Sequence, residues 1–402
     1  MINIENFTKE HVIERKESLF LPDIIANKET LSKEIDGKDI LVIGGAGSIG
    51  SSFIKAVLKF NPSKLVVVDL NENGLAELTR DLRSSVDINI PPIYLTYTLD
   101  FADPIFKKIF DEHGGFDIVA NFSAHKHVRS EKDKYSVEAL LRNNVLKAKV
   151  LLDLLASNPP SHFFCVSTDK AANPVNVMGA SKKVMEDLIM AYSKDFKVST
   201  ARFANVAFSN GSLPLSFFER MMKHQPLVAP DDVKRYFVSL EESGQICMLA
   251  CILGKSGEVF FPKLEEKQMK TFSSICDLFI KEMGYNKLEC HTDMEAKEIA
   301  AHQTLADKDY PVYYFKSDTT GEKGYEEFFI EGETRDMERF SSLGVILPKS
   351  NRSKQEVNEF LQKLEGTFMD KNFTKAQVVS CLKEFLPNFE HKEMGKNLDQ
   401  KM

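Results

Sequence analysis

The sequence predicts an α/β fold built on a doubly wound parallel sheet, and two observations support this prediction. From Asp39 to Asn205, short apolar runs alternate with segments of helical periodicity, the order that βαβ units produce. The first apolar run leads directly into a glycine-rich turn that opens an amphipathic helix. After Asn205 the regular alternation stops, and mixed short strands and helices predict a smaller mixed α/β domain.

The individual elements follow from length and spacing. Six apolar runs have the length of buried parallel strands: Asp39–Ile43, Lys64–Asp69, Ile93–Leu99, Asp117–Phe122, Phe163–Thr168 and Val198–Phe203. Segments with helical spacing lie between and after them: Ile49–Phe60, Glu72–Leu82, Pro104–Glu112, Ser136–Leu155, Val177–Lys194, Gln245–Leu253 and Phe272–Met283.

Bulk composition excludes several classes of function. With 402 residues the chain can bury a large core, and its net charge of −7 argues against a nucleic-acid or anionic-membrane partner. Residues 1–16 lack the apolar core of a signal peptide, and the apolar run Ile246–Leu253 is too short to span a bilayer. The six cysteines show no disulfide framework and no metal-site spacing. We therefore expect a cytoplasmic protein without metal and without membrane insertion.

The glycine-rich turn predicts a dinucleotide site of the Rossmann type. Without Cβ atoms, Gly44, Gly47 and Gly50 let the backbone approach a pyrophosphate, which then rests on N–H groups of the helix N-terminus. Asp69 ends the second strand, 19 residues after Gly50, where a carboxylate can accept both ribose hydroxyls and would repel a 2′-phosphate. NAD is therefore expected rather than NADP. The alternative is a structural glycine turn with an unrelated Asp.

These changes of pattern divide the chain into four expected units. They are an N-terminal helical extension at 1–38, an NAD-binding Rossmann domain at 39–205 interleaved with part of the next segment, a substrate-binding domain at 206–348, and a charged helical tail at 349–402. Within the extension, residues 19–22 are expected to make the only apolar contact. For both ends we expect a solvated helical surface. The tail should break at Asn372 and Pro387.

The end of the fifth strand carries a candidate acid/base pair. Asp169 and Lys170 place a carboxylate and an amine side by side at the sheet edge where α/β proteins bind ligands. A protonated Asp with a neutral Lys contains as many protons as the ion pair, so the two groups can titrate as one unit. The alternative is a solvated ion pair in a strand-to-loop turn.

Six segments together carry a family resemblance. They are GGAGSIGSSF (44–53), NFSAHKHVRSE (121–131), STDKAANPVNVMGASK (167–182), RFANVAFSNGS (202–212), KRYFVS (234–239) and TGEKGYEEF (320–328). In this order they resemble the extended short-chain dehydrogenase/reductases, specifically the nucleotide-sugar 4,6-dehydratases of bacterial polysaccharide biosynthesis. The greatest similarity is to the UDP-N-acetylglucosamine (UDP-GlcNAc) 4,6-dehydratases.

The resemblance implies a hydro-lyase with tightly bound NAD. Such an enzyme oxidises the sugar C4 hydroxyl, removes the C5 proton and the C6 hydroxyl as water, and returns the hydride to C6. The implied reaction converts UDP-GlcNAc to a UDP-4-keto-6-deoxy-HexNAc for polysaccharide or glycan synthesis. By resemblance, Asp169 is the acid and Lys170 the base.

One position departs from the usual pattern. Short-chain dehydrogenases usually place a tyrosine where this chain has Met178, and a thioether cannot carry a proton. Because the dehydratase subgroup includes members with methionine there, the departure does not exclude catalysis. Asp169, with Thr168 as hydrogen-bond relay, becomes the candidate for deprotonating the C4 hydroxyl, and Lys182 is expected to hold the nicotinamide ribose.

The resemblance also implies the remaining site residues. Those expected at the cofactor are Gly44, Gly47, Ser48, Ile49, Gly50, Asp69, Asp100, Ala124 and Lys182. Those expected at the nucleotide sugar are Lys126, Asn205, Ser212, Arg235 and Glu322. Asp100 has a strand-end cap as its alternative role, and Arg202 a structural one. Since relatives commonly associate through helices of the sheet domain, a homo-oligomer is expected.

Two other functions stay open. A nucleotide-sugar 4-epimerase needs only C4 oxidation and return of the hydride, usually with a tyrosine base, so Met178 and the Asp169–Lys170 pair count against it. A non-catalytic NAD-binding sensor would tolerate Met178 but has no need of an acid/base pair.

Overall fold

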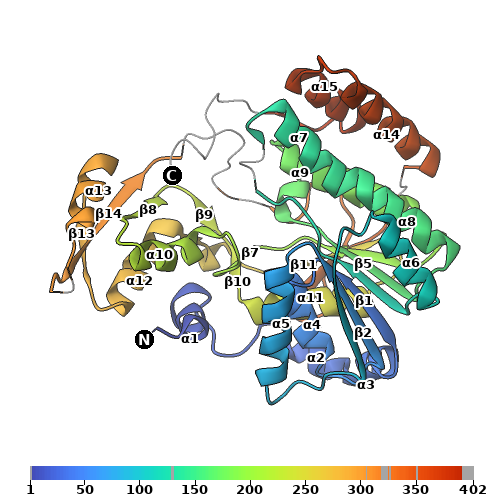
Figure 1. Cartoon of the computed structure of the whole chain (residues 1–402), viewed down its shortest axis with the longest axis horizontal. Helices are drawn as coiled ribbons and strands as arrows, with labels where there is room; N and C mark the ends of the chain where they lie inside the picture. Colours follow the sequence, from blue (N-terminus) through green and yellow to red (C-terminus); the bar gives the residue numbers. More distant parts are fainter. Residues whose placement is uncertain are drawn as a thin grey trace.

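A nine-stranded sheet runs through the larger part of the molecule (Figure 1). The computed structural model describes residues 2–127, 131–304, 306–317, 325, 327–349 and 352–391. The strands of this sheet are β1 (Asp39–Ile43), β2 (Lys64–Asp69), β3 (Ile93–Thr98), β4 (Ile118–Asn121), β5 (His162–Val166), β6 (Val198–Ala201), β11 (Glu258–Pro262), β15 (Arg335–Asp336) and β16 (Leu343–Ile346). All six expected strands occur in it, and β1 and β2 have the expected bounds.

The strand order is that of a doubly wound fold. It reads β15-β16-β11-β6-β5-β4-β1-β2-β3, so the chain starts near the middle and winds outward in both directions. Every neighbouring pair from β11 to β3 is parallel, whereas β16 is antiparallel to β11. The predicted α/β Rossmann class is therefore confirmed. The expectation of burial for residues 93–99 is wrong, because β3 forms the edge of the sheet and its side chains are half-buried or exposed.

Helices connect the parallel strands, as the apolar spacing predicts. They are α4 (Ser48–Val57), α5 (Glu72–Ser84), α6 (Pro104–Glu112), α7 (Lys134–Leu141), α8 (Lys147–Ser157) and α9 (Val177–Ala191). The single helix expected over 136–155 is in fact two helices, because a π-helical turn at Arg142–Leu146 separates α7 from α8. Such turns are rare and often lie at functional sites. The apolar period continues through this one, so the spacing alone did not reveal it.

The second half of the chain returns to the sheet. Helix α11 (Leu240–Leu253), which contains the expected helix 245–253, packs against α4, and β11 pairs with β6. The two helices approach closely at Gly244, where a Cβ atom would lie 2.1 Å from the backbone oxygen of Ser52. Elements from 206–348 therefore share a sheet with those from 39–205. The division of the chain into four units stays a prediction.

A second apolar core lies in the smaller lobe, at the left of Figure 1. Its elements are α10 (Leu213–Met222), β8 (Leu227–Pro230), α12 (Phe272–Glu282), β13 (Asn286–Glu289), α13 (Asp293–Ala301) and β14 (Asp309–Phe315). The strands form a separate sheet in the order β13-β14-β8. Phe217 and Phe279 meet in this core with their ring centroids 6.0 Å apart. The smaller lobe is mixed α/β, as predicted.

The N-terminal residues complete both cores. Their elements are α1 (Ile4–Phe7), a π-helical turn (Thr8–Val12), α2 (Leu21–Ala26) and α3 (Lys28–Ile35). Phe7 is buried in the second core, where its ring centroid lies 5.7 Å from that of Phe208, and Leu31 is buried in the main core. The expectation that residues 19–22 make the only apolar contact is therefore wrong. Charged residues between these positions obscured the apolar side of each short element.

The tail also packs on the main core. Helices α14 (Lys354–Met369) and α15 (Lys375–Phe385) form a pair beside α9, at the upper right of Figure 1. The rings of Phe360 and Phe385 stack with centroids 4.2 Å apart, and Leu364 is fully buried. The expected break at Asn372 falls between the two helices, and the one at Pro387 follows α15. The expectation of a solvated helical surface for this tail is therefore wrong.

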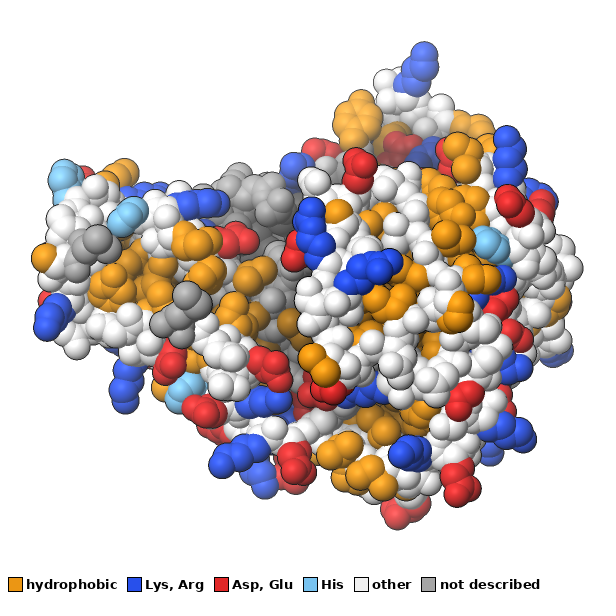
Figure 2. All heavy atoms as spheres, turned by 60° about the horizontal axis from the view of Figure 1, so that its bottom comes forward, with side chains coloured by type: hydrophobic (Ala, Val, Ile, Leu, Met, Phe, Trp, Pro, Cys, Tyr) orange, Lys and Arg blue, Asp and Glu red, His pale blue; other side chains and the backbone are white. Residues whose placement is uncertain are grey.

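Charge is spread over the surface without a dominant sign on the face drawn in Figure 2, where acidic and basic side chains are interspersed. An anionic ligand would therefore have to be held by local groups. In the part of the chain that the structure describes, no helix combines the length and the apolar character that a bilayer crossing requires.

The close contact between α4 and α11 yields a stability prediction. Gly244→Ala should cost about 1–3 kcal/mol, because the new Cβ must push the helices apart. The matched control is Gly366 in α14, where nothing lies within 4 Å of an added Cβ. Gly366→Ala should stabilise the fold by up to about 1 kcal/mol. The thermal unfolding midpoints should thus move in opposite directions, and equal shifts would contradict the close contact.

Candidate active site

Three chain segments meet at the carboxyl edge of the sheet. Strands β5, β4 and β1 are adjacent and parallel, so the segments that follow them start side by side. These segments are the glycine-rich turn at 44–47, the loop at 122–127 and the stretch at 167–170. Strand β2, beside β1, adds Asp69 to the same edge. The fold thereby gathers the expected cofactor and catalytic residues at one place.

The first turn of α4 is suited to an anion. Gly47 forms its N-cap with extended backbone, and no side chain accepts a hydrogen bond there as a cap. A Cβ at Gly50 would lie 2.3 Å from the backbone oxygen of Gly44, so the helix can start directly against the turn only with glycine at this position. The N–H groups of Ser48 and Ile49 are thus left at the positive end of the helix. This arrangement could hold a pyrophosphate.

Asp69 closes the turn from the neighbouring strand. Its Oδ2 accepts a hydrogen bond from the backbone N–H of Ala46 at 3.0 Å, and its Oδ1 accepts one from Asn71 at 2.9 Å. Each carboxylate oxygen has two lone-pair sites, so one on each oxygen is left for a ligand hydroxyl. The carboxylate can therefore fix the turn and still receive a ribose.

Asp100 serves as a strand-end cap. Its Oδ1 accepts a hydrogen bond from the N–H of Ala102 at 2.9 Å, and its Oδ2 forms an ion pair with Lys147. It also lines a cavity of about 50 Å³ next to Asp69. The whole lining of this cavity is Ile43, Gly44, Val68, Asp69, Leu70, Leu99, Asp100, Phe101, Ser123 and Asn143. Asp100 thus has the capping role that was its alternative and also lines the cavity beside Asp69.

Asp169 has one engaged and one open carboxylate oxygen. Its Oδ1 accepts hydrogen bonds from the Thr168 hydroxyl at 2.8 Å, the Lys170 backbone N–H at 2.8 Å and the Lys170 amine at 3.2 Å. Its Oδ2 has no hydrogen-bond partner among the residues that the structure describes. Asp169 is 4% exposed, so this second oxygen keeps unused lone pairs in a nearly buried position.

Lys182 and Met178 are both buried on α9. The Lys182 amine donates a hydrogen bond to the backbone oxygen of Val166, at the end of β5, at 2.9 Å. Burial lowers the pKa of Lys182, because removal from water penalises the charged form. The amine therefore lies at the end of the strand that leads to Asp169. Among the described contacts, none joins the side chain of Lys182 directly to that of Asp169.

A buried ion pair fixes the chain at the end of β5. The guanidinium of Arg202 donates to both carboxylate oxygens of Glu186, at 2.9 and 2.8 Å, and the Ser167 hydroxyl donates to the same carboxylate at 2.6 Å. Burial opposes ionisation of Glu186, but Arg202 outweighs it and holds the pKa of Glu186 below its usual value. Arg202 therefore has the structural role that was its alternative. It anchors the residue that precedes the Thr168–Lys170 stretch.

The loop after β4 is tied to the cofactor turn. Ala124 is half-buried in this loop, and the Lys126 amine donates to the backbone oxygen of Asn210 at 2.8 Å. The N–H of Asn210 donates in turn to the Ser48 hydroxyl at 2.8 Å. Asn210 thus bridges an expected substrate residue and an expected cofactor residue. Asn210 belongs to the segment 202–212, but nothing in its sequence context predicts this bridging position.

The other expected substrate residues come from the region after β6. Asn205 begins β7 (Asn205–Val206), which pairs in parallel with β10 (Phe237–Val238), and Arg235 lies just before β10 in β9 (Lys234–Arg235). Asn205 and Arg235 are thereby placed in neighbouring segments, and Arg235 is buried. The Ser212 hydroxyl caps α10 by accepting a 3.4 Å hydrogen bond from Leu215. Glu322 lies outside the described residues.

The π-helical turn supplies residues that the sequence did not reveal. Asn144 Oδ1 accepts a hydrogen bond from the N–H of His125 at 2.8 Å, and its amide donates to the His125 oxygen and to the Ser181 hydroxyl, both at 3.0 Å. Asn144 therefore joins the loop after β4 to α9. The neighbouring Asn143 lines the cavity beside Asp69. Two adjacent asparagines inside an apolar helical pattern were the available clue.

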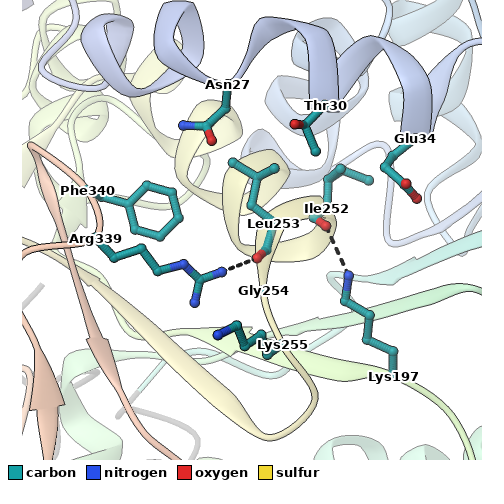
Figure 3. Close-up of a pocket in the computed structure, with 10 residues that line it drawn as sticks. All are labelled: Asn27, Thr30, Glu34, Lys197, Ile252, Leu253, Gly254, Lys255, Arg339 and Phe340. Atoms are coloured by element: carbon teal, nitrogen blue, oxygen red, sulfur yellow. Dashed lines mark hydrogen bonds between the residues drawn. The ribbon is translucent and has the colours of Figure 1, made fainter.

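A different pocket, of about 530 Å³, lies at the opposite edge of the sheet (Figure 3). Its lining includes Lys197, just before β6, and residues 252–255, shortly before β11, so it lies at the amino ends of these two strands. The amine of Lys197 and the guanidinium of Arg339 donate to the backbone oxygens of Ile252 and Leu253. These cations satisfy carbonyl groups at the end of α11, a structural role typical of a helix C-terminus.

Two solved structures share this fold. Pen from Bacillus thuringiensis superposes with a TM-score of 0.64 at 21% identity, over 80% of this chain and 91% of its own. DesIV from Streptomyces venezuelae, a dTDP-glucose 4,6-dehydratase with NAD bound, gives a TM-score of 0.54 at 19% identity, over 72% of this chain and 87% of its own. At these identities the likeness concerns the fold alone, a doubly wound parallel sheet of the Rossmann type.

Sequence relatives extend the comparison. The uncharacterized membrane protein MJ1061 of Methanocaldococcus jannaschii is 30% identical over 80% of this chain and 89% of its own length. CapD of Staphylococcus aureus, a capsular polysaccharide biosynthesis protein, is 31% identical over 57% of this chain but 38% of its own length. The UDP-glucose 4-epimerase of Rickettsia massiliae is 26% identical over 74% of this chain and 88% of its own. Residues 40–347 match the family described as "Polysaccharide biosynthesis protein", and the chain therefore belongs to that family.

Proposed function

We propose that this protein is an NAD-dependent nucleotide-sugar 4,6-dehydratase, with UDP-GlcNAc as substrate and UDP-4-keto-6-deoxy-HexNAc as product. The observation that carries the proposal is the Asp169–Lys170 pair at the end of β5, where one carboxylate oxygen is held by Thr168 and Lys170 and the other has no hydrogen-bond partner among the described residues. An acid and a base in contact are what loss of water from a sugar requires. Membership of a polysaccharide biosynthesis family supports the same reading.

NAD is the proposed cofactor. Its pyrophosphate would rest on the uncapped first turn of α4, its adenosine ribose on Asp69, and its nicotinamide ribose near Lys182. When bound, NAD would accept the hydride from the sugar C4 and return it to C6. The remaining cofactor positions are assigned to Ser48, Ile49, Asp100 and Ala124.

The proton transfers can be assigned to this chain's own groups so that they balance. Asp169, through the Thr168 hydroxyl, takes the proton of the C4 hydroxyl as C4 is oxidised. Lys170 takes the C5 proton, which the C4 ketone makes acidic, and Asp169 gives its proton to the departing C6 oxygen. Lys170 then returns a proton to C5 as the hydride arrives at C6. Each group ends in its starting state, and one water has left.

This scheme starts with an ionised Asp169 and a neutral Lys170, so the pair then holds one proton fewer than an ion pair. Once Asp169 has taken the C4 proton, a protonated acid and a neutral amine lie in contact, with the Lys170 amine 3.2 Å from Asp169 Oδ1. Lys170 can then accept the C5 proton. The nucleotide diphosphate is assigned to Asn205, Ser212 and Arg235, and Lys126 to the sugar or its phosphates. Glu322, outside the described residues, keeps its assignment to the nucleotide by resemblance alone.

A 4-epimerase is the second candidate, because one relative that covers most of this chain is a UDP-glucose 4-epimerase. Epimerisation would require only a base for the C4 hydroxyl. Met178, buried on α9, cannot serve as that base.

One assay separates the two functions. The protein is incubated with UDP-GlcNAc in D₂O, and the nucleotide sugar is followed by mass spectrometry. Loss of water with deuterium at C5 supports the dehydratase, whereas an unchanged mass with a new stereoisomer supports the epimerase. Bound NAD without turnover of UDP, GDP or CDP sugars would instead indicate a sensor.

The acid/base pair can be tested directly. Asp169→Asn and Lys170→Ala should each abolish water loss, because one proton carrier is removed, while NAD remains bound. Turnover by mass spectrometry and NAD content by absorbance are the measurements. Full activity in either variant would refute the assignment.

Lys182 should show a trade between stability and activity. Lys182→Met removes a buried amine but keeps the aliphatic stem, so the thermal midpoint at pH 7 should stay equal or rise while turnover falls at least about tenfold. Burial lowers the pKa of Lys182, so as pH rises the folded protein loses this proton at a lower pH than the unfolded chain does. Any difference in stability between Lys182→Met and the wild type should therefore narrow as the pH rises toward 10.5, the ordinary pKa of a lysine.

The matched control for Lys182 is Lys183→Met, which removes an amine paired with Asp187 on the partly exposed side of the same helix. This variant should change neither midpoint nor turnover appreciably. A large loss of stability in Lys182→Met would contradict the account.

Asp69 should set the preference for NAD over NADP. Asp69→Asn keeps an oxygen acceptor but removes the charge that would repel a 2′-phosphate. The preference, measured as the ratio of dissociation constants by fluorescence titration, should fall by about tenfold or more. An unchanged ratio would show that Asp69 serves only to fix the turn.

A further inference from the structure

Glu131 is a buried carboxylate that joins two distant parts of the chain. It is 4% exposed and follows the loop after β4. Its Oε2 accepts a hydrogen bond from the backbone N–H of Val177 at 2.8 Å. Its Oε1 contacts the imidazole of His391 and lies 3.6 Å from the amine of Lys375. Val177 opens α9, whereas the other two residues belong to the C-terminal segment.

On one side, this carboxylate completes the cap of α9. The Asn176 side chain accepts the N–H of Gly179 at 2.7 Å, and Glu131 accepts the N–H of Val177. A carboxylate at this end also interacts favourably with the positive end of the helix. Glu131 therefore fixes the first turn of the helix that carries Met178 and Lys182.

That first turn lies directly beneath the proposed base. A Cβ at Gly179 would lie 2.6 Å from the backbone oxygen of Lys170. The backbone of Lys170 thus rests against α9 without room for a side chain between them. A shift of the first turn of α9 would displace Lys170, and with it the hydrogen bonds that Asp169 receives.

On the other side, the tail is held in place by several contacts. Lys375 also donates to the backbone oxygen of Glu131 at 2.9 Å, and Lys134 donates to the oxygen of Lys371 at 3.1 Å. The Phe373 ring meets Tyr135 edge-on with centroids 6.4 Å apart. These contacts bring the start of α15 against the segment that contains Glu131.

We propose that the C-terminal segment 352–391 helps to position the active-site residues. Lys375 and His391 hold Glu131, and Glu131 holds the first turn of α9 against Lys170. Glu131 is thus a positioning residue for the acid/base pair. A carboxylate is the group this position requires, because it accepts the helix N–H and pairs with two basic groups at once. This inference rests on the proposed function.

The test compares variants on both sides of the contact. Glu131→Ala removes every side-chain acceptor, and Glu131→Gln keeps an oxygen for the N–H of Val177. The double variant Lys375→Met/His391→Phe removes the tail's polar contacts. Lys363→Met is the matched control, because Lys363 pairs only with Glu384, between α14 and α15, among the described contacts.

Two readouts are measured well below the unfolding midpoint of each variant. Turnover of UDP-GlcNAc should fall about 10- to 100-fold in kcat for Glu131→Ala, with KM little changed, because misplacement of reacting groups slows chemistry. The fall in kcat should be smaller for Glu131→Gln than for Glu131→Ala. The double variant should also have a lower kcat than the wild type. Hydrogen exchange at the Val177 amide should become faster in Glu131→Ala and in the double variant, but not in Lys363→Met.

Hydrogen exchange separates this inference from the proposed function, since it needs no substrate. Unchanged exchange at Val177 in Glu131→Ala and the double variant would overturn the inference, whatever the activity. An unchanged kcat in Glu131→Ala would overturn it as well. Faster exchange together with an inactive wild-type protein would leave the Glu131 contact in place and sink the proposed dehydratase instead.

Discussion

The parallel hydrogen-bonded register of β5, β4, β1 and β2 is the constraint on which the rest of the structure depends. Parallel strands all end at the same edge, so segments more than a hundred residues apart in sequence begin next to one another there. The glycine-rich turn needs Asp69 from the neighbouring strand to receive the N–H of Ala46. Asp169 and Lys170 follow β5 and so lie at the same edge as the turn. A shift of the strand pairing by one residue would separate these groups.

Buried charge around this edge is matched by specific partners. Arg202 and Glu186 hold each other and Ser167, Asp100 is paired with Lys147, and Asp169 receives three donors on one oxygen. The amine of Lys182, by contrast, donates to a backbone oxygen, and burial lowers the pKa of Lys182. Unfavourable burial of an amine is a cost that proteins retain mainly at functional sites.

The described N-terminal and C-terminal segments pack into the two apolar cores. The N-terminal residues close the second core, where Phe7 meets Phe208, and α14 packs beside α9. Their many charged residues lie between apolar positions, so each short helix has one buried side and one solvent-exposed side. The buried sides give the ends a fixed place in the fold. Through Glu131, the tail then contacts α9, whose first turn lies against the backbone of Lys170.

The sequence by itself determined the fold class, the strands β1 and β2 to the residue, and the chemistry available at residues 44–50, 69 and 167–170. These features are local, because apolar period, glycine spacing and strand-end polarity are properties of neighbouring residues. Only the tertiary structure decided that Asn144 joins His125 to α9, that Arg202 is structural, and that Glu131 meets His391. These contacts link positions far apart in the chain, and nothing in the local pattern distinguishes a buried partner from a solvated side chain. The edge position of β3 and the packing of both termini were hidden for the same reason.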